Sequence, residues 1–379
     1  MALKHLLVFL WTLTALAQGA ADLTPPAPGP VAPPAAPLSG LPVLCYHRFG
    51  EEDGIDKLKI SGEHFAEELA WLKEQGYQSV TLEQAAQFLE GKTQGLPEHP
   101  VMLTIDDGYR SGWQIAGPVL QSYGFKAVYF LIEGQLELTP SFLAWSDVRE
   151  LLAAGHQVGS HTLRHSNLAK PLRSEESRDY ARRLDTELQE SRRRLERRLG
   201  LTLTALAYPY GAFNPVVEAA ALKAGYGTLF TATSGINLAG EGRHSVNRFV
   251  VMGPPSLESF KRKIHERRLG AGLDGMANGE GFYASQLPRT VLIRMPAGEL
   301  DAEPRVELQG FRRKIERARD PGTWTLTLPQ GLRPRFYYLK IEAGASPDIR
   351  RDRFLFQVYK DAWKGWFQTE GEDDVALVP

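Results

Sequence analysis

Short apolar runs alternate with amphipathic segments between residues 41 and 268, and this alternation predicts a repeating order of strands and helices. Val101–Ile105 has the uninterrupted apolar character of a buried strand, whereas Glu63–Gln75 carries apolar residues at helical spacing. Another helix is expected over Asp147–Ala154, with Ser146 as its cap. Strands that alternate with helices indicate parallel βαβ units, so we expect an α/β barrel or a layered sheet.

The longest predicted helix is Ser174–Leu199, where apolar residues recur at steps of three and four and Gly200 follows. The run Arg192–Arg194 alternates with glutamates that include Glu187. We interpret these charged residues as the solvated outer face of the helix, because such a mixture is more typical of a solvated surface than of an anion site.

Helix signals disappear after residue 268. The glycine-rich segment 269–280 is interpreted as a hinge, and 281–362 as a small β-sandwich-like accessory domain whose strands are separated by Pro, Gly and Asp. A glycan or protein partner for this domain and a purely structural role both remain open. Residues 363–379 are expected to form a solvated C-terminal tail. The predicted strands are Thr290–Met295, Arg305–Gly310, Thr323–Leu328, Phe336–Glu342 and Arg353–Tyr359.

The N-terminal segment is typical of an exported protein. Residues 1–21 combine a short polar start, an apolar stretch too short for a comfortable membrane span and small residues near its end, which predicts a secretory signal peptide. An uncleaved anchor is the alternative. Residues 22–40 are rich in Pro and Ala and predict an extended linker. We therefore expect a periplasmic, extracellular or envelope-associated protein without a stable transmembrane segment after cleavage.

Composition narrows the classes of partner. The 44 Lys and Arg residues nearly balance the 45 Asp and Glu residues, so no strong positive electrostatic field favours the binding of nucleic acid. Cys45 is the single cysteine, which excludes an internal disulfide. Its place in an apolar run favours a buried structural thiol over a nucleophile.

Two adjacent carboxylates, Asp106 and Asp107, directly follow the strand Val101–Ile105, and Gly108 permits a tight turn after them. Burying unpaired charge is costly, so packing explains them poorly. The carboxyl ends of parallel strands are where α/β proteins usually carry out chemistry. This stretch is therefore the leading candidate for an active site.

His161 and His165 stand four residues apart, and we expect them on one face of a helical turn, where both can bind one cation. A carboxylate would complete a site for Zn²⁺ or a related divalent ion such as Co²⁺ or Ni²⁺. The second carboxylate would then be free to act as a base. Two surface histidines would give the same spacing, so the paired aspartates carry the hypothesis.

Three segments, Thr104–Gly108, Ser160–His165 and Tyr208–Gly211, resemble the first three motifs of the polysaccharide deacetylase family, also called carbohydrate esterase family four or the NodB homology domain. The resemblance covers about residues 41–268. It implies a distorted (β/α) barrel with fewer strands than the eight-stranded type, and metal-dependent hydrolysis of an acetyl group on a sugar.

The resemblance also implies roles for single residues. Asp106 matches the catalytic base, while Asp107, His161 and His165 match the metal ligands. Tyr210 matches the residue whose backbone N–H helps to hold the oxyanion.

Two departures from the family pattern matter. Ala207 occupies the place of an arginine that contacts the base, and Arg248 is our candidate substitute. The histidine of the family's last motif is absent at the end, but Val43–His47 at the front resembles that motif. The chain is therefore similar to the circularly permuted subgroup of exported poly-β-1,6-N-acetylglucosamine deacetylases, and His47 is assigned as the general acid. Trp145 fits the same subgroup.

The expected activity is removal of N-acetyl groups from an extracellular or cell-wall polymer of N-acetylglucosamine. An O-acetyl polysaccharide esterase and a non-catalytic glycan-binding module are the alternatives. Tyr109, Trp113, Trp145 and Tyr210 could stack on sugar rings, although packing is the commoner role of aromatic residues.

Overall fold

The computed structural model describes residues 40–358 except 53–55, 254–255, 270, 275–281, 285–288, 330, 334 and 345–348. The predicted signal peptide, the linker up to residue 39 and the predicted tail lie outside the described residues. Over the described part, no helix has the length and apolar content that crossing a membrane requires.

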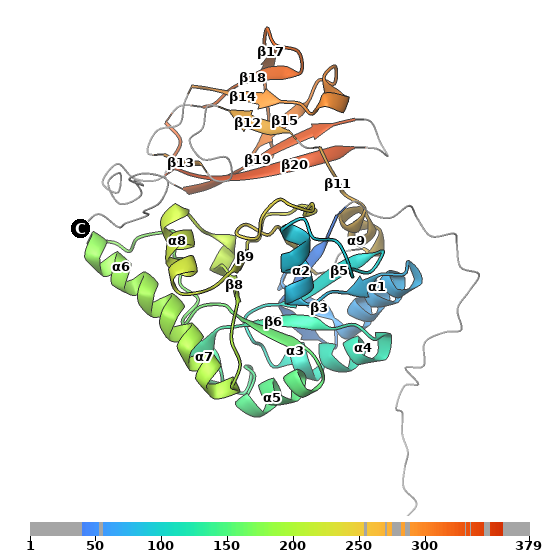
Figure 1. The fold of residues 1–379 in the computed structure, drawn as a ribbon, viewed down its shortest axis with the longest axis vertical. Coiled ribbons are helices and arrows are strands. Elements are labelled where there is room, and N and C mark those ends of the chain that lie inside the picture. Colours follow the sequence, from blue (N-terminus) through green and yellow to red (C-terminus); the bar gives the residue numbers. More distant parts are fainter. Residues whose placement is uncertain are drawn as a thin grey trace, which may run out of the picture. The chain divides into compact units, whose positions relative to one another are not determined.

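The N-terminal part is built on one curled parallel sheet with helices along its outer side (Figure 1). The strand order is β10-β1-β5-β6-β7-β8-β9, and the two-residue strand β4 branches off beside β5. This confirms the expected distorted (β/α) barrel. Among the described residues the main path of the sheet has seven strands, and β4 is an eighth strand that pairs with β5. The strands are β1 (Val43–Tyr46), β4 (Gln78–Ser79), β5 (Pro100–Ile105), β6 (Ala127–Leu131), β7 (Gln157–Ser160), β8 (Ala205–Ala207), β9 (Thr228–Phe230) and β10 (Phe249–Val250).

The position of β1 follows from its pairing with both β5 and β10, each in parallel register. The first strand of the sheet thus lies beside its last strand, as expected for a strand that has moved to the front of the chain. The turn after β1 leads into a separate small parallel pair, β2 (Arg48–Gly50) and β3 (Lys59–Ser61).

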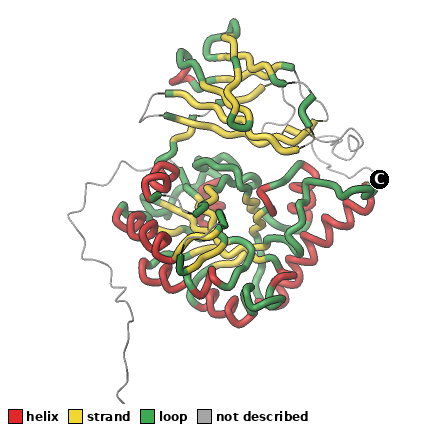
Figure 2. The backbone as a smooth tube through the Cα atoms, turned by 180° about the vertical axis from the view of Figure 1, so that it is seen from behind, coloured by secondary structure: helices red, strands yellow, loops and turns green. Residues whose placement is uncertain are grey.

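Helices follow the strands much as the sequence predicts (Figure 2). The cap of α5 is an exception: Ser146 is not the cap, because the helix begins at Trp145 and the Asp147 carboxylate accepts from Ala144 N–H at 2.8 Å. The helices are α1 (Gly62–Glu74), α2 (Leu82–Leu89), α3 (Ser111–Gln114), α4 (Ala116–Tyr123), α5 (Trp145–Ala153), α6 (Ser177–Asp185), α7 (Ser191–Leu199), α8 (Pro215–Lys223) and α9 (Leu257–Ile264).

Alternation along β5 aims the first functional carboxylate. Val101, Leu103 and Ile105 pack in the cluster that includes the outer helices, whereas Met102 belongs to the cluster on the other side of the sheet. Because side chains of a strand alternate between faces, Thr104 and then Asp106 share the side of Met102. The hydrophobic pattern therefore directs Asp106 towards the inside of the barrel.

The C-terminal part is all-β, as predicted. One sheet has the order β11-β20-β19-β15-β16, with β13 beside β20, and the other has the order β12-β14-β18-β17. Buried side chains from both sheets, among them Ile293, Leu326 and Leu339, share one core cluster. The strands are β11 (Arg267–Arg268), β12 (Gly272–Asp274), β13 (Phe282–Ala284), β14 (Thr290–Arg294), β15 (Arg305–Leu308), β16 (Phe311–Arg313), β17 (Ile315–Arg317), β18 (Thr323–Thr327), β19 (Arg335–Ala343) and β20 (Arg350–Val358).

Strand β12 lies inside the glycine-rich segment interpreted as a hinge, where Leu273 pairs with Ile293 of β14. A glycine-rich segment has little propensity of its own for a strand, so this pairing comes from the neighbouring strand and not from local sequence. The boundaries proposed for the two domains stay a prediction.

One buried carboxyl group makes stability depend on pH. Glu68 of α1 is 3 % exposed and accepts a hydrogen bond from Tyr46 Oη at 2.9 Å. Burial raises the pKa of Glu68 from 4.5 to about 8. Between these values the folded chain keeps a proton that the unfolded chain releases, so stability falls as pH rises through this range.

We therefore expect Glu68→Gln, which keeps an acceptor for Tyr46 but cannot ionise, to remove this loss. The gain over the wild type should be small near pH 5 and on the order of 5 kcal/mol near pH 9, because a pKa difference of one unit corresponds to about 1.4 kcal/mol. Urea unfolding at both pH values measures it. Parallel pH profiles for the two proteins would show that folding does not shift the pKa of Glu68.

Candidate active site

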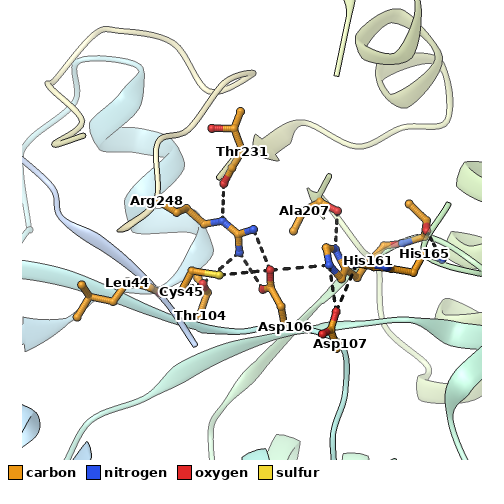
Figure 3. A network of polar contacts seen from close by, with 12 residues as sticks. Leu44, Cys45, Thr104, Asp106, Asp107, His161, His165, Ala207, Thr231 and Arg248 are labelled. Atoms are coloured by element: carbon orange, nitrogen blue, oxygen red, sulfur yellow. Dashed lines mark hydrogen bonds and ion pairs between the residues drawn. The ribbon is translucent and has the colours of Figure 1, made fainter. Parts of the chain in front are cut away.

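Asp107, His161 and His165 bring three potential metal-binding atoms together although they come from different elements (Figure 3). Asp107 follows β5, and the two histidines follow β7. Asp107 Oδ1 lies 3.4 Å from His161 Nε2 and 3.5 Å from His165 Nε2. The three donor atoms are all within 4.8 Å of one another. Two imidazole nitrogens and one carboxylate oxygen form a donor set that suits Zn²⁺ and related ions.

The two histidines are not on a helical turn, so that part of the sequence prediction is wrong. They lie in an irregular loop in which Thr162 has φ 67° and His165 has φ 61°. Asp107 has φ 72°, and Tyr210 has φ 61°. Left-handed backbone is uncommon in residues other than glycine and gathers at functional sites, where the surroundings hold it in place.

The hydrogen bonds of His161 suit a metal ligand. Its Nδ1 lies 2.8 Å from the carbonyl oxygen of Ala207, which can only accept, so Nδ1 carries the proton. This leaves the lone pair on Nε2, which faces Asp107. Asp107 Oδ1 is buried and has no hydrogen-bond partner among the described residues. A divalent cation would satisfy both atoms, and the residues present therefore fit such an ion.

Asp106 is held by a buried arginine. Arg248 Nη1 and Nη2 each lie 2.8 Å from one carboxylate oxygen of Asp106, and Arg248 Nε donates to Thr231 O at 2.7 Å. Both partners of the ion pair are 1 % exposed. Arg248 thus makes the contact that Ala207 cannot make.

Electrostatics keep Asp106 ionised. Burial by itself raises the pKa of this carboxyl group, but the charges of Arg248 and His161 outweigh burial and hold the pKa well below its usual range. His161 Nε2 lies 3.8 Å from Asp106 Oδ2, farther than from Asp107 Oδ1. Asp106 is therefore a carboxylate beside the three metal-binding atoms and not part of that set.

His47 lies at the end of β1, next to Asp106. A ring nitrogen of His47, Cys45 Sγ and an oxygen of Asp106 are all within 4.8 Å of one another. Burial lowers the pKa of His47, and the charges of Asp106 and Asp107 oppose this. Its Nδ1 is buried without a hydrogen-bond partner in the described structure. Sequence reasoning placed His47 at this site, and the structure brings it there.

The two histidines differ in their electrostatics. Burial lowers the pKa of His165 to about 4, with the charge of His161 acting in the same direction. The pKa of His161 is raised, because the carboxylates of Asp106 and Asp107 outweigh the effect of burial. His165 is therefore a neutral imidazole at pH 7, which is the form that binds metals.

Tyr210 lies beside His165. Its side chain is 64 % exposed, and its ring centroid is 4.6 Å from that of His165. The turn Pro209–Gly211 needs glycine at its end, because a Cβ on Gly211 would come within 2.4 Å of Ala232 N. This turn places the ring of Tyr210 next to that of His165.

The other predicted aromatic residues separate into two groups. Tyr109 lies near the site, directly after Gly108, and its ring stacks on Phe142 at 5.0 Å. Trp145 is buried in the outer core, and Trp113 bonds to a carboxylate on α5, so neither belongs to the site.

Arg48 is a feature near the site that was not assigned from sequence, whereas Cys45 was expected to be a structural thiol. The guanidinium carbon of Arg48 lies 4.1 Å from the Tyr109 ring centroid. In the sequence, only the position of Arg48 next to His47 could have pointed to this residue. Cys45 Sγ lies 3.4 Å from Asp106 Oδ2, and burial raises the pKa of this thiol well above its usual value. A neutral thiol is a poor nucleophile, which agrees with a structural role.

Several known proteins resemble this chain in sequence or in fold. A family model described as polysaccharide deacetylase matches residues 93–229. YxkH of Bacillus subtilis, which is named as a polysaccharide deacetylase, is 28 % identical over 228 residues, which is 60 % of this chain and 77 % of that protein. Poly-beta-1,6-N-acetyl-D-glucosamine N-deacetylase of Escherichia coli is 26 % identical over 264 residues, and the match spans 60 % of this chain but 39 % of that enzyme.

Among solved structures, IcaB from Ammonifex degensii is 30 % identical with a TM-score of 0.52. That match covers 60 % of this chain and 97 % of IcaB. The similarity thus extends over nearly the whole of that solved structure but over only part of this chain.

Proposed function

Because this chain belongs to the polysaccharide deacetylase family, we propose that it hydrolyses N-acetyl groups on a β-1,6-linked N-acetylglucosamine polymer outside the cytoplasm. The name of the E. coli relative supports this substrate. The expected export supports this location. The observation that carries the proposal is the convergence of Asp107, His161 and His165 beside the buried Asp106–Arg248 pair and His47.

Asp107, His161 and His165 would hold the metal ion, with Zn²⁺ as the first expectation and Co²⁺ or Ni²⁺ as alternatives. Such an ion supplies Lewis acidity for the acetyl carbonyl and makes a nearby water molecule more acidic. The carbonyl of Ala207 would fix the tautomer of His161, so that Nε2 is available as a ligand.

The protein's own residues account for the proton transfers. Asp106 accepts a proton from the attacking water, whose oxygen bonds to the acetyl carbon. Arg248 keeps Asp106 ionised and fixes both of its oxygens. His47 donates a proton to the sugar nitrogen as the C–N bond breaks, so the products are acetate and a free amine. The backbone N–H of Tyr210 donates to the oxyanion, a contribution of about 3–4 kcal/mol for one donor in other enzymes.

The test is acetate and free-amine release by the purified chain with and without a chelator. The substrates are β-1,6- and β-1,4-linked N-acetylglucosamine oligomers, O-acetyl xylan and peptidoglycan. We expect metal-dependent release that is fastest on the β-1,6 oligomers. Acetate from xylan alone would favour an esterase. Bound metal and glycan without any release would favour a non-catalytic binding module.

His47→Asn is expected to lower kcat by about 10²–10⁴-fold, the usual range for loss of a general acid. Metal content should not change, because His47 is not one of the three metal-binding residues. Kinetics on the oligomer and metal analysis measure the two effects separately. Normal turnover by this variant would remove His47 from the mechanism.

A further inference from the structure

Glu187 is a buried carboxylate that contacts the loop of the two histidines and is not part of the mechanism above. The residue is 1 % exposed. Glu187 Oε2 accepts from the backbone N–H groups of Leu163 at 3.1 Å and Arg164 at 2.8 Å. Glu187 Oε1 accepts from Ser166 Oγ at 3.0 Å. One side chain thus bonds to three residues that lie between or directly after His161 and His165.

The helix that carries Glu187 is locally widened towards this loop. The segment Thr186–Glu190, between α6 and α7, is a π-helix. The backbone oxygen of Glu187 accepts from Leu163 N–H at 3.1 Å, and that of Leu188 accepts from Tyr226 Oη at 3.1 Å. Carbonyl groups in a π-turn can take partners outside the helix, and such turns are frequent at functional sites.

The histidine loop needs such an anchor. Thr162 and His165 both have left-handed backbone, which persists only where the surroundings hold it. Hydrogen bonds to an ionised acceptor are stronger than neutral ones. Glu187 supplies three of them, and Arg164 Nη1 at 3.5 Å from Glu187 Oε1 adds an opposite charge on the outside.

We propose that Glu187 is a positioning residue that holds His161 and His165 in the geometry needed to bind one metal ion. This inference rests on the metal site of the proposed function, and it assigns the π-helical turn a role in building that site.

The experiment compares Zn²⁺ affinity, measured by competition with a chromophoric chelator, in the wild type and in Glu187→Ala. Residues that orient metal ligands typically change metal affinity by about 10–100-fold when they are lost, and we expect a weakening of this size. Leu195→Ala is the matched control, because it deletes a buried side chain of α7 in the outer core. It should lower thermal stability but leave the Zn²⁺ affinity unchanged.

A second variant covers the case in which Glu187→Ala does not fold. Glu187→Gln keeps one acceptor oxygen but loses the charge and the second acceptor, so a smaller weakening of Zn²⁺ binding is expected. An unchanged affinity in the folded glutamine and alanine variants, or an equal loss in Leu195→Ala, overturns the proposal. If the wild type binds no Zn²⁺, the metal site itself fails. If it binds and releases acetate while Glu187 variants bind equally well, only the role of Glu187 fails.

Discussion

Asp106→Asn is expected to lower kcat by about 10²–10⁴-fold while the protein still binds its metal ion. The amide has nearly the shape of the carboxylate but cannot accept a proton at neutral pH. Asp106 is not one of the three proposed metal ligands, because its two oxygens face Arg248 at 2.8 Å. Kinetics on β-1,6-linked oligomers and metal analysis of the same preparation measure both expectations.

Two neighbouring substitutions serve as controls. Asp107→Asn should show the opposite pattern, with metal lost first, because Asp107 Oδ1 faces both histidines. Cys45→Ala removes only the thiol contact with Asp106 and should keep most of the turnover. Metal loss in Asp106→Asn would make Asp106 a ligand, and an inactive Cys45→Ala would return the thiol to the mechanism.

The sequence predicted the parts of the site that depend on local pattern. The apolar run of β5 has period-two alternation in the structure, and that alternation directs Asp106 inward. The place of His47, by contrast, came from the resemblance of Val43–His47 to the last motif of the family. Strand ends are readable because a run of apolar residues stops where solvent or chemistry begins.

The histidine pair shows where local pattern fails. A spacing of four residues matches a helical turn, but the loop reaches the same convergence with left-handed backbone at Thr162 and His165. Spacing gives the separation along the chain and not the path between the residues. The side chains of Thr162 and His165 do not predict a positive φ, because the folded surroundings determine this backbone conformation.

Glu187 shows a second limit. Its charge and its neighbours predicted a solvated face, and this interpretation is wrong for Glu187, which is buried under the histidine loop. Glu187 lies three residues after the buried Leu184 and four before the buried Ser191, so helical spacing places it on the buried side and only its charge suggested the outer face. Glu190, Arg193 and Arg194 in the same helix do form the expected exposed ion pairs.

Arg248 required knowledge of strand order. It was a candidate from sequence, yet its contact with Asp106 spans 142 positions along the chain. That contact exists because β1 lies between β5 and β10, which brings the residue before β10 towards the end of β5. A permuted strand order is visible only as a displaced motif in the sequence.

The Asp106–Arg248 pair should dominate the stability of the site. Arg248→Met leaves Asp106 as a buried charge without its main partner, and we expect the free energy of unfolding to fall by about 3–5 kcal/mol. The Asp106→Asn/Arg248→Met double variant has neither charge and should recover much of this loss, because two neutral groups need no counterion. Urea unfolding of the wild type, both single variants and the double variant gives the coupling energy.

Activity should not follow stability in this cycle. The double variant is expected to be as inactive as Asp106→Asn, since the base is still missing.

Arg248→Lys keeps the charge but cannot form two parallel hydrogen bonds, so intermediate stability is expected. Arg193→Met, on an exposed ion pair of α7, should leave the free energy of unfolding nearly unchanged. If the losses of the two single variants simply add, the Arg248 guanidinium stabilises the barrel through Thr231 and Thr104 and not through Asp106. Asp106 would then be kept ionised by the histidines and their metal.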